Sequence, residues 1–247
     1  MTRSLQGKAA LVTGGSRGIG AAIARRLAAD GAAVAITYST SKAKADAVVD
    51  AIRTGGGKAF AFAADAADAA ALTNAVGAAA KALGGLDVLV NNAGVAHFAP
   101  IDTFSLDEYD RLMAVNARAV FVASKAAVPL LHEGGRIVNI GSVNADRMPV
   151  VGGAVYAMSK AAVAGLTRGL ARDLGSRGIT VNAVQPGPVG TDMNPPEGAF
   201  ADRLRAMLAL ARYGRPEEIA SLVAWLAGPE SAFMTGACLT IDGGFAT

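Results

Sequence analysis

The sequence predicts a single α/β domain, built on a doubly wound parallel sheet of about seven strands with helices on both faces. Three observations predict it. A chain of 247 residues fits one α/β domain. Short apolar runs alternate with helix-length segments along the whole chain, which produces right-handed βαβ units. The apolar runs are mostly continuous rather than alternating, as in strands that are buried on both faces. We therefore expect one domain over residues 1–247.

The expected elements follow one another in regular order. The predicted strands are Ala9–Thr13, Ala33–Tyr38, Lys58–Ala63, Leu86–Asn91, Arg136–Gly141, Ile179–Gln185 and Cys238–Ile241. The predicted helices are Gly18–Asp30, Lys42–Thr54, Ala66–Leu83, Leu106–Leu131, Tyr156–Gly175 and Pro216–Ala227. Ser105 and Glu108 have the spacing of a capping box at the start of the fourth helix. Gly175 lies where the fifth helix should end.

The segment Gly190–Tyr213 interrupts this alternation and begins with an Asn-Pro-Pro-Glu-Gly turn at Asn194–Gly198. Ligands of doubly wound folds bind outside the carboxyl ends of the strands. A long irregular connection at that edge is typical of a functional loop. We therefore expect residues 190–213 to form a substrate lid.

Composition excludes several classes of protein. Hydrophobic residues make up 52% of the chain and charged residues 17%, which excludes a disordered chain. One cysteine, Cys238, and two histidines exclude a Cys/His zinc cluster, and we expect no metal site. The net charge of +3 comes from scattered residues, and aromatic residues are only 5%. We therefore expect no nucleic-acid partner.

The hydropathy of the sequence argues against a membrane-spanning segment, and we expect no membrane partner. No uninterrupted apolar run reaches the roughly 18 residues of a membrane span. The first apolar run, Ala9–Val12, is too short for the core of a signal peptide. We therefore expect a cytoplasmic protein.

A glycine-rich segment follows the first predicted strand and opens the first helix. It reads Thr13-Gly14-Gly15-Ser16-Arg17-Gly18-Ile19-Gly20, with the spacing Gly-x-x-x-Gly-x-Gly. The N-terminus of a helix favours phosphate, and glycines let the backbone approach it closely. An ordinary glycine-rich turn is the alternative. The strand and the helix that flank the segment favour nucleotide binding.

This spacing resembles the short-chain dehydrogenase/reductase family, and further motifs agree with it in chain order. They are Asn91-Asn92-Ala93-Gly94, Asn116, Ser142, the Tyr-x-x-x-Lys pair Tyr156 and Lys160, Pro186-Gly187 with Thr191, and Asp242-Gly243-Gly244. The resemblance covers residues 13–244 and implies a Rossmann-type sheet. It also implies a nicotinamide cofactor bound by Gly14, Ser16, Arg17, Gly18, Ile19, Gly20, Tyr38, Ser39, Asp65, Asn92, Ala93, Gly94, Tyr156, Lys160, Pro186, Gly187, Val189 and Thr191.

Tyr156 and Lys160 are four residues apart on a predicted helix and so share one face. A free tyrosine has a pKa of about 10, and a neighbouring cation favours its phenolate form. A surface Tyr–Lys pair is the alternative, which the accompanying motifs disfavour. The resemblance implies that Tyr156 donates a proton to a carbonyl oxygen that Ser142 also hydrogen-bonds. It further implies that Lys160 lowers the Tyr156 pKa and holds the nicotinamide ribose, while Asn116 anchors a proton-relaying water.

The end of the second predicted strand indicates which cofactor is used. NAD-dependent members of the family usually carry an acid there. This chain has Tyr38 followed by Ser-Thr-Ser-Lys, with no acid. A 2′-phosphate needs hydrogen-bond donors and positive charge, which Arg17, Ser39 and Lys42 would supply. We therefore predict NADP(H). Asp65 matches the family's adenine-contacting acid, with a loop-capping role as the alternative.

The expected substrate pocket has walls at Val143–Gly153, His97 and the lid, and their mixed polarity names no single substrate. We expect NADPH-dependent reduction of a small ketone or β-keto ester. Two alternatives stay open. The chain also resembles 3-oxoacyl-carrier-protein reductases, although Pro129–Gly135 lacks the basic residues that meet an acidic carrier. The segment Gly141–Pro149 resembles a cyclic-di-GMP-binding biofilm-dispersal branch of the family, in which the fold is a nucleotide sensor.

Assembly is expected from the same resemblance. Members of the family usually form tetramers, which implies a homotetramer here. The segments Leu106–Leu131 and Trp225–Phe245 are more apolar than surface segments usually are, and such faces need a partner.

Overall fold

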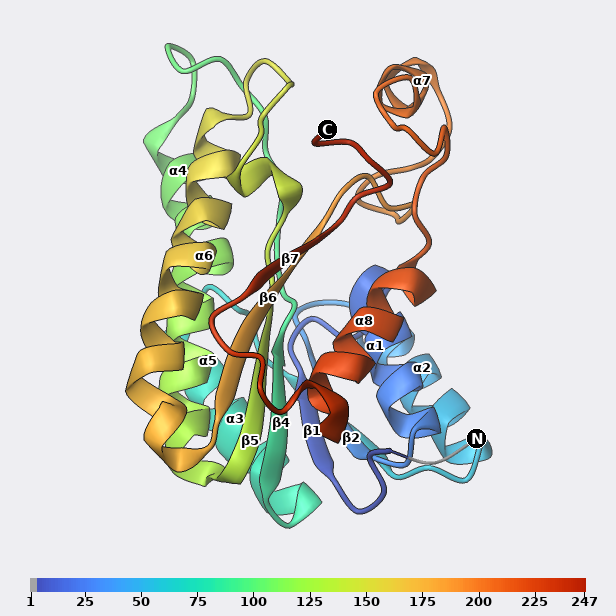
Figure 1. Ribbon diagram of the computed structural model, residues 1–247, viewed down its shortest axis with the longest axis vertical. Coiled ribbons are helices and arrows are strands. Elements are labelled where there is room, and N and C mark those ends of the chain that lie inside the picture. The colour runs from blue at the N-terminus through green and yellow to red at the C-terminus, as the bar shows by residue number, and fades with distance from the viewer. Residues whose placement is uncertain (1–3) are drawn as a thin grey trace.

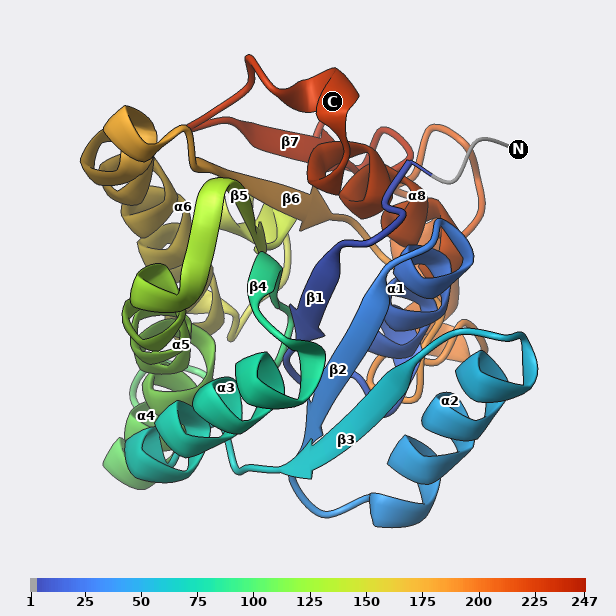
Figure 2. The ribbon, with the colours of Figure 1, turned by 90° about the horizontal axis from the view of Figure 1, so that it is seen from below.

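The computed structural model describes residues 4–247. Seven strands form one parallel sheet in the order β3-β2-β1-β4-β5-β6-β7 (Figure 2). The strands are β1 (Ala9–Val12), β2 (Ala33–Tyr38), β3 (Ala59–Ala63), β4 (Leu86–Asn91), β5 (Leu131–Ile140), β6 (Thr180–Pro186) and β7 (Cys238–Ile241). The predicted doubly wound sheet is confirmed. Because the winding reverses between β1 and β4, the crevice between their carboxyl ends is the expected ligand site.

Helices cover both faces of the sheet, as Figure 1 shows. The faces are covered by α1, α2 and α8 on one side and by α3, α4, α5 and α6 on the other. The helices are α1 (Gly18–Ala29), α2 (Lys42–Thr54), α3 (Ala69–Leu83), α4 (Leu106–Met113), α5 (Ala119–Ala127), α6 (Ala154–Leu174), α7 (Ala199–Arg205) and α8 (Pro216–Ala227). Five of the six predicted helices are present at or close to the predicted bounds, and the sixth, Leu106–Leu131, is divided.

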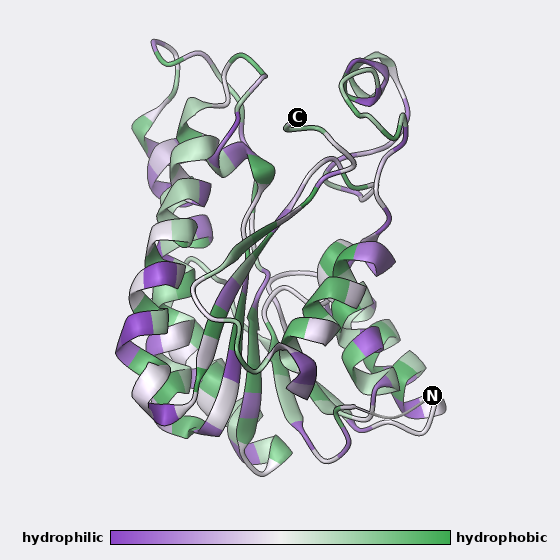
Figure 3. Ribbon diagram, viewed as in Figure 1, coloured by the Kyte–Doolittle hydropathy of each residue, from purple (hydrophilic) through white to green (hydrophobic). Residues whose placement is uncertain are grey.

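Each face of the sheet has its own hydrophobic core. Val12 and Ile36 pack with α1, α2 and α8 on one face. Leu11 and Leu89 pack with α3, α5 and α6 on the other. Neighbouring residues of a strand point to opposite faces, so a strand buried on both sides must be apolar throughout. Figure 3 shows this as a hydrophobic sheet between helices with hydrophilic outer faces.

The helix predicted over Leu106–Leu131 is interrupted. Between α4 and α5 the chain forms a π-helical turn at Ala114–Arg118, and a 3₁₀ turn at Val128–Leu130 ends it. Strand β5 then begins at Leu131, five residues before the predicted start. The stretch Leu106–Leu130 has the length and composition of a membrane span, but 44% of its most apolar window is buried inside the molecule. This is the pattern of a helix packed on a core.

One predicted helix end is confirmed, and one helix start is confirmed only in part. Helix α6 ends at Leu174 with Gly175 as its C-cap, as predicted; a 3₁₀ turn follows to Arg177, and the left-handed conformation, with φ of 66°, falls at Gly178. Of the predicted capping box, the structure shows one half, in which the Ser105 hydroxyl accepts a hydrogen bond from the Glu108 N–H at 3.2 Å.

The segment 190–213 is more ordered than the sequence indicates. It contains α7, whose Ala201 and Leu204 pack with Leu208, Tyr213 and Phe245 in a small separate core. Figure 1 places α7 beyond the carboxyl ends of the strands, across from the upper ends of α4 and α6. That position agrees with a lid, and its action on a substrate stays a prediction.

Candidate active site

A pocket of about 420 Å³ opens at the carboxyl ends of the strands. All 18 predicted cofactor residues line it, together with Ser142. These residues come from the ends of β1, β2, β3, β4, β5 and β6 and the segments that follow them, and from α6. The fold therefore brings the separate sequence motifs together in one crevice.

The glycine loop after β1 has no room for side chains. Gly14 has a φ of +62°, and a Cβ atom there would lie 2.9 Å from the Ala93 Cα. A Cβ atom on Gly15 would lie 2.6 Å from Cγ2 of Ile36. Gly18, at the first position of α1, also has a left-handed φ of +53°. The backbone N–H groups at this helix start therefore remain accessible to an anion.

Hydrogen bonds join the glycine loop to the turn after β4. The Asn92 amide Nδ2 donates to the carbonyl oxygens of Thr13 at 2.9 Å and Gly14 at 3.1 Å. The Thr13 hydroxyl oxygen accepts from the N–H groups of Asn92 at 3.0 Å and Ala93 at 3.1 Å. A Cβ atom on Gly20 would collide with the Asn92 side chain. The loop and the turn thus form one rigid cradle that fits a dinucleotide.

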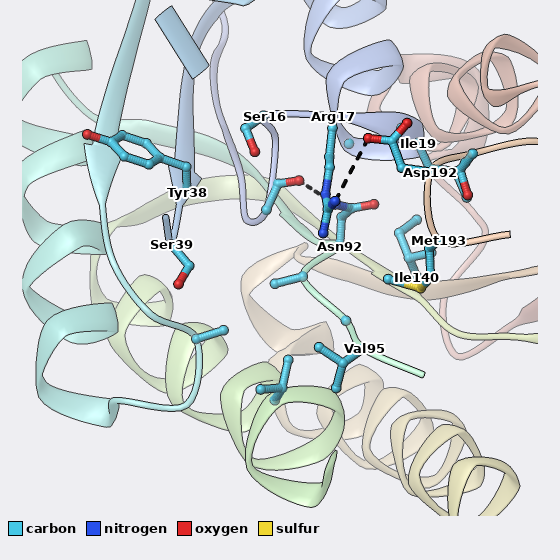
Figure 4. A pocket seen from close by; sticks show the side chains of 18 of the residues that line it. Ser16, Arg17, Ile19, Tyr38, Ser39, Asn92, Val95, Ile140, Asp192 and Met193 are labelled. Atoms are coloured by element: carbon cyan, nitrogen blue, oxygen red, sulfur yellow. Dashed lines mark hydrogen bonds and ion pairs between the residues drawn. The ribbon is translucent and has the colours of Figure 1, made fainter. Parts of the chain in front are cut away.

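The cationic end of the pocket differs in part from the sequence prediction. Figure 4 shows Arg17 between Tyr38 and Ser39 on one side and Asp192 and Met193 on the other. The side chains of Arg17 and Ser39 line the pocket as predicted.

Lys42 does not join this end of the pocket. Its Nζ donates to Asp46 Oδ2 at 2.7 Å within α2, and this hydrogen bond raises the Lys42 pKa. The contribution of Lys42 to a phosphate site therefore stays a prediction, since its ammonium is paired with a carboxylate on its own helix.

Lys160 is buried below the pocket floor, with 5% of its surface exposed. Its Nζ donates to the Ile140 carbonyl oxygen at 3.1 Å and lies 5.9 Å from the centroid of the Tyr156 ring. Burial lowers the Lys160 pKa from 10.5 to about 8. The ammonium remains the main form at neutral pH, and it needs little energy to release its proton.

Tyr156 is a protonated phenol in this environment. Burial raises its pKa above 10, and a hydrogen bond with Ser142 offsets only part of this effect. The raised pKa means that burial outweighs any lowering by Lys160, whose Nζ lies 5.9 Å from the centroid of the ring. A neutral phenol at pH 7 is nevertheless the form that a proton donor requires.

Ser142 follows β5 and is held in place by a local hydrogen bond. Its hydroxyl oxygen accepts from the Asn144 N–H at 3.1 Å and caps the short 3₁₀ turn Val143–Ala145. The hydroxyl proton stays available for another acceptor. Ser142 and Tyr156 therefore both present hydroxyl groups at one pocket wall.

Asn116 lies in the π-helical turn and does not line the pocket. Its Oδ1 accepts from the Val95 N–H at 2.9 Å, and its Nδ2 donates to the Val95 carbonyl oxygen at 2.9 Å and to Ser159 Oγ at 3.1 Å. Ser159 in turn donates to the Tyr156 carbonyl oxygen at 2.7 Å. Asn116 therefore links the turn after β4 to α6, the helix that carries Tyr156 and Lys160. The predicted water relay stays a prediction.

Sequence reasoning missed one neighbour of Tyr156 and misplaced part of the substrate wall. The ring of Phe98 lies 5.5 Å from that of Tyr156, centroid to centroid. His97 does not line the pocket, because it packs edge-on against Phe104 and lies 3.7 Å from Glu108 Oε2. The lid does contribute to the lining, through Thr191, Asp192, Met193 and Asn194. Nothing in the residue pattern around 97–98 distinguishes the two orientations.

Two curated relatives match the chain over nearly its whole length. It is 51% identical over 239 residues to the cyclic-di-GMP-binding biofilm dispersal mediator protein of Escherichia coli, covering 97% of both chains. It is 41% identical over 244 residues to a 3-oxoacyl-[acyl-carrier-protein] reductase of Synechocystis, covering 98% of both.

Solved structures match the chain over nearly its whole length as well. A short-chain dehydrogenase/reductase from Serratia marcescens superposes with a TM-score of 0.98 at 59% identity, covering 99% of this chain and 100% of the other. A short-chain dehydrogenase from Burkholderia cenocepacia, in complex with NADP, gives 0.97 at 56% identity with the same coverage. A family model described as enoyl-(acyl carrier protein) reductase matches residues 14–246. The chain therefore belongs to the short-chain dehydrogenase/reductase family of oxidoreductases.

Proposed function

We propose that the protein is an NADPH-dependent carbonyl reductase that converts a ketone or β-keto ester to a secondary alcohol, with Tyr156 as proton donor. One observation carries this proposal. A neutral phenol, a serine hydroxyl and a buried lysine meet a glycine cradle in a single pocket. The relative from Burkholderia cenocepacia that shares 56% of its residues was crystallised with NADP.

The residues of the pocket fit a phosphorylated dinucleotide. The cradle at the start of α1 offers backbone N–H groups and carries no acidic residue in its first turn. Tyr38 stands where an acid would favour the free ribose of NADH. Arg17 supplies the positive charge that a 2′-phosphate needs.

The chain's own groups then account for the reaction at the carbonyl oxygen. A nicotinamide held in this pocket would supply the hydride to the carbonyl carbon. The Tyr156 hydroxyl donates its proton to the oxygen, and the Ser142 hydroxyl stabilises the negative charge that develops there. Lys160, with its pKa of about 8, lies beneath Tyr156 and supplies positive charge to the same region.

A small free substrate is favoured over a carrier-linked one. The segment Pro129–Gly135 offers no lysine or arginine to an acidic carrier. Arg177 donates to the carbonyl oxygens of Val128 and Leu131, each at 2.9 Å, which holds part of its guanidinium against the molecule. The Synechocystis relative keeps 3-oxoacyl-carrier-protein reduction as an alternative.

A second candidate function is cyclic-di-GMP binding. It is favoured by the 51% identity to the Escherichia coli protein of that name. A cradle for the two phosphates of a dinucleotide has the chemistry to hold a cyclic dinucleotide as well. The presence of Ser142, Tyr156 and Lys160 together favours the enzyme, because a sensor has no need of them.

The deciding experiment is a screen of NADPH oxidation with ketones, free β-keto esters and the same acyl group on carrier protein, at low and physiological salt. We expect turnover of free substrates with little salt dependence. An advantage of about a hundredfold for the carrier-linked substrate, fading as salt rises, would establish carrier docking instead. A parallel calorimetric titration with cyclic-di-GMP separates the sensor: tight binding without turnover of any carbonyl would overturn the proposal.

The proposal extends to a cytoplasmic homotetramer. Leu106 and Phe121 on one side, and Trp225 and Phe233 on another, expose large apolar side chains that need a partner. Four chains of 24.7 kDa should give about 99 kDa by light scattering at micromolar concentration. A mass near that of one chain would contradict this.

A further inference from the structure

Two cations from different elements meet one carboxylate at the mouth of the pocket. Nζ of Lys44, in α2, lies 2.8 Å from Oδ2 of Asp192. Nη1 of Arg17, in the glycine loop, lies 3.8 Å from the same oxygen. The three side chains are about half exposed. We call this arrangement of Asp192, Lys44 and Arg17 the carboxylate clasp.

Asp192 stands at the base of the lid. Thr191 and Asn194 exchange backbone hydrogen bonds of 3.2 and 3.0 Å, which close a tight turn around Asp192. Thr191 itself packs against the glycine loop, since a Cβ atom on Gly18 would lie 3.3 Å from its methyl group. The clasp therefore joins α2 to the first residues of the lid.

Two lysines of α2 that the sequence does not distinguish have different partners in the structure. Lys42 is bound to Asp46 at 2.7 Å on its own helix. Lys44 instead donates to Asp192, whose Oδ2 also lies 3.8 Å from Arg17. The hydrogen bond from Lys44 lowers the Asp192 pKa, so the carboxylate is charged at neutral pH. The Asp192 carboxylate thus already occupies the point where the side chains of Lys44 and Arg17 converge.

We infer that Arg17 and Lys44 form the 2′-phosphate site, that Asp192 occupies it as an internal anion, and that the phosphate of NADP(H) replaces Asp192 there. This inference rests on the proposed function. A phosphate carries more charge than a carboxylate and offers three acceptor oxygens to the two cations. Exposed ion pairs are weak, so the exchange is favourable. Replacement releases the Asp192 carboxylate, whereas NADH, which has no such phosphate, leaves the clasp in place.

The test is calorimetric binding of NADPH and NADH to the full-length protein and to four variants. Lys44→Met should raise the Kd for NADPH about tenfold and leave that for NADH within about twofold, because one charge-assisted contact to phosphate is lost. Lys42→Met is the matched control, and it should change neither Kd. Asp192→Asn should lower the Kd for NADPH, because the competing anion is gone, without changing that for NADH.

The double variant, Lys44→Met with Asp192→Asn, measures the competition directly. The loss caused by Lys44→Met should be larger in the Asp192→Asn background, since the lysine no longer has to leave a carboxylate. Equal effects of Lys42→Met and Lys44→Met, or weaker NADPH binding by Asp192→Asn, would overturn the inference while leaving the proposed function intact. Failure of the unmodified protein to bind NADPH would overturn both.

Discussion

The ring of Phe98 packs against the ring of Tyr156, with centroids 5.5 Å apart and planes inclined by 35°. Phe98 is 43% exposed, so the part of its ring that does not pack on Tyr156 is open to solvent. Its ring keeps water from one side of the phenol. Burial is the main cause of the raised Tyr156 pKa, and Phe98 contributes to that burial.

Phe98→Ala should therefore lower kcat/KM about three- to tenfold, because an aromatic pair contributes about 0.5–1.5 kcal/mol to positioning. The alkaline limb of the pH–rate profile should also move to lower pH, as the phenol becomes more hydrated. Phe104→Ala is the control, since Phe104 packs against His97 and not against the pocket. A loss of activity with an unmoved pH profile would show that Phe98 does not shield Tyr156.

Tyr156→Phe should abolish most turnover and leave NADPH binding nearly unchanged. The proton of the phenol acts only in the transition state, so kcat falls while the cofactor Kd holds. Steady-state rates and calorimetry on the same preparation measure the two quantities. Retention of more than about a tenth of the activity would identify another proton donor.

Lys160 should make the protein more stable as the pH rises from about 8 to 10. Its pKa is about 8 in the folded state and 10.5 in the unfolded state, so the unfolded chain binds more protons in this window. The difference corresponds to roughly 3 kcal/mol. Urea unfolding at several pH values should show this rise in the unmodified protein and not in Lys160→Met. Parallel curves for the two proteins would show that the lysine is not buried as a charge.

The ionised Asp87 side chain should stabilise the fold at every pH above the pKa that Asp87 has in the unfolded chain. Burial raises its pKa, but hydrogen bonds from the Ala9 N–H, Lys8 and His132 outweigh burial and lower it. The stabilisation is therefore present at neutral pH and is lost as pH falls through the folded-state pKa. Asp87→Asn should cost about 1–2 kcal/mol at pH 7 and progressively less in acid. The exposed Asp102→Asn is the control, and a similar cost for both would contradict this role.

Most of the fold follows from residue patterns that report local physics. The strands β1, β2 and β4 are apolar runs buried on both faces, and they were predicted to within one residue. The glycine loop was predicted because its spacing meets a steric requirement, visible in the contact between Gly14 and Ala93. The 18 cofactor residues that the family resemblance implies also share this one pocket.

What the sequence did not predict depends on contacts between distant segments. The π-helical turn at Asn116 forms around hydrogen bonds to Val95 and Ser159, which helical periodicity does not report. The choice between Lys42 and Lys44 depends on Asp46 and Asp192, one near in sequence and one 148 residues away from Lys44. The cofactor motifs can be recognised within short stretches of sequence, whereas these pairs form between segments that only the folded chain brings together.

The measurement that tests the account most directly is the ratio of kcat/KM for NADPH to that for NADH, with the best carbonyl substrate of the screen. Arg17 and the absence of an acid at Tyr38 predict a ratio of at least about tenfold, within the reach of one charge-assisted contact. Tyr38→Asp should shift the ratio towards NADH. Equal or better use of NADH by the unmodified protein would contradict the account.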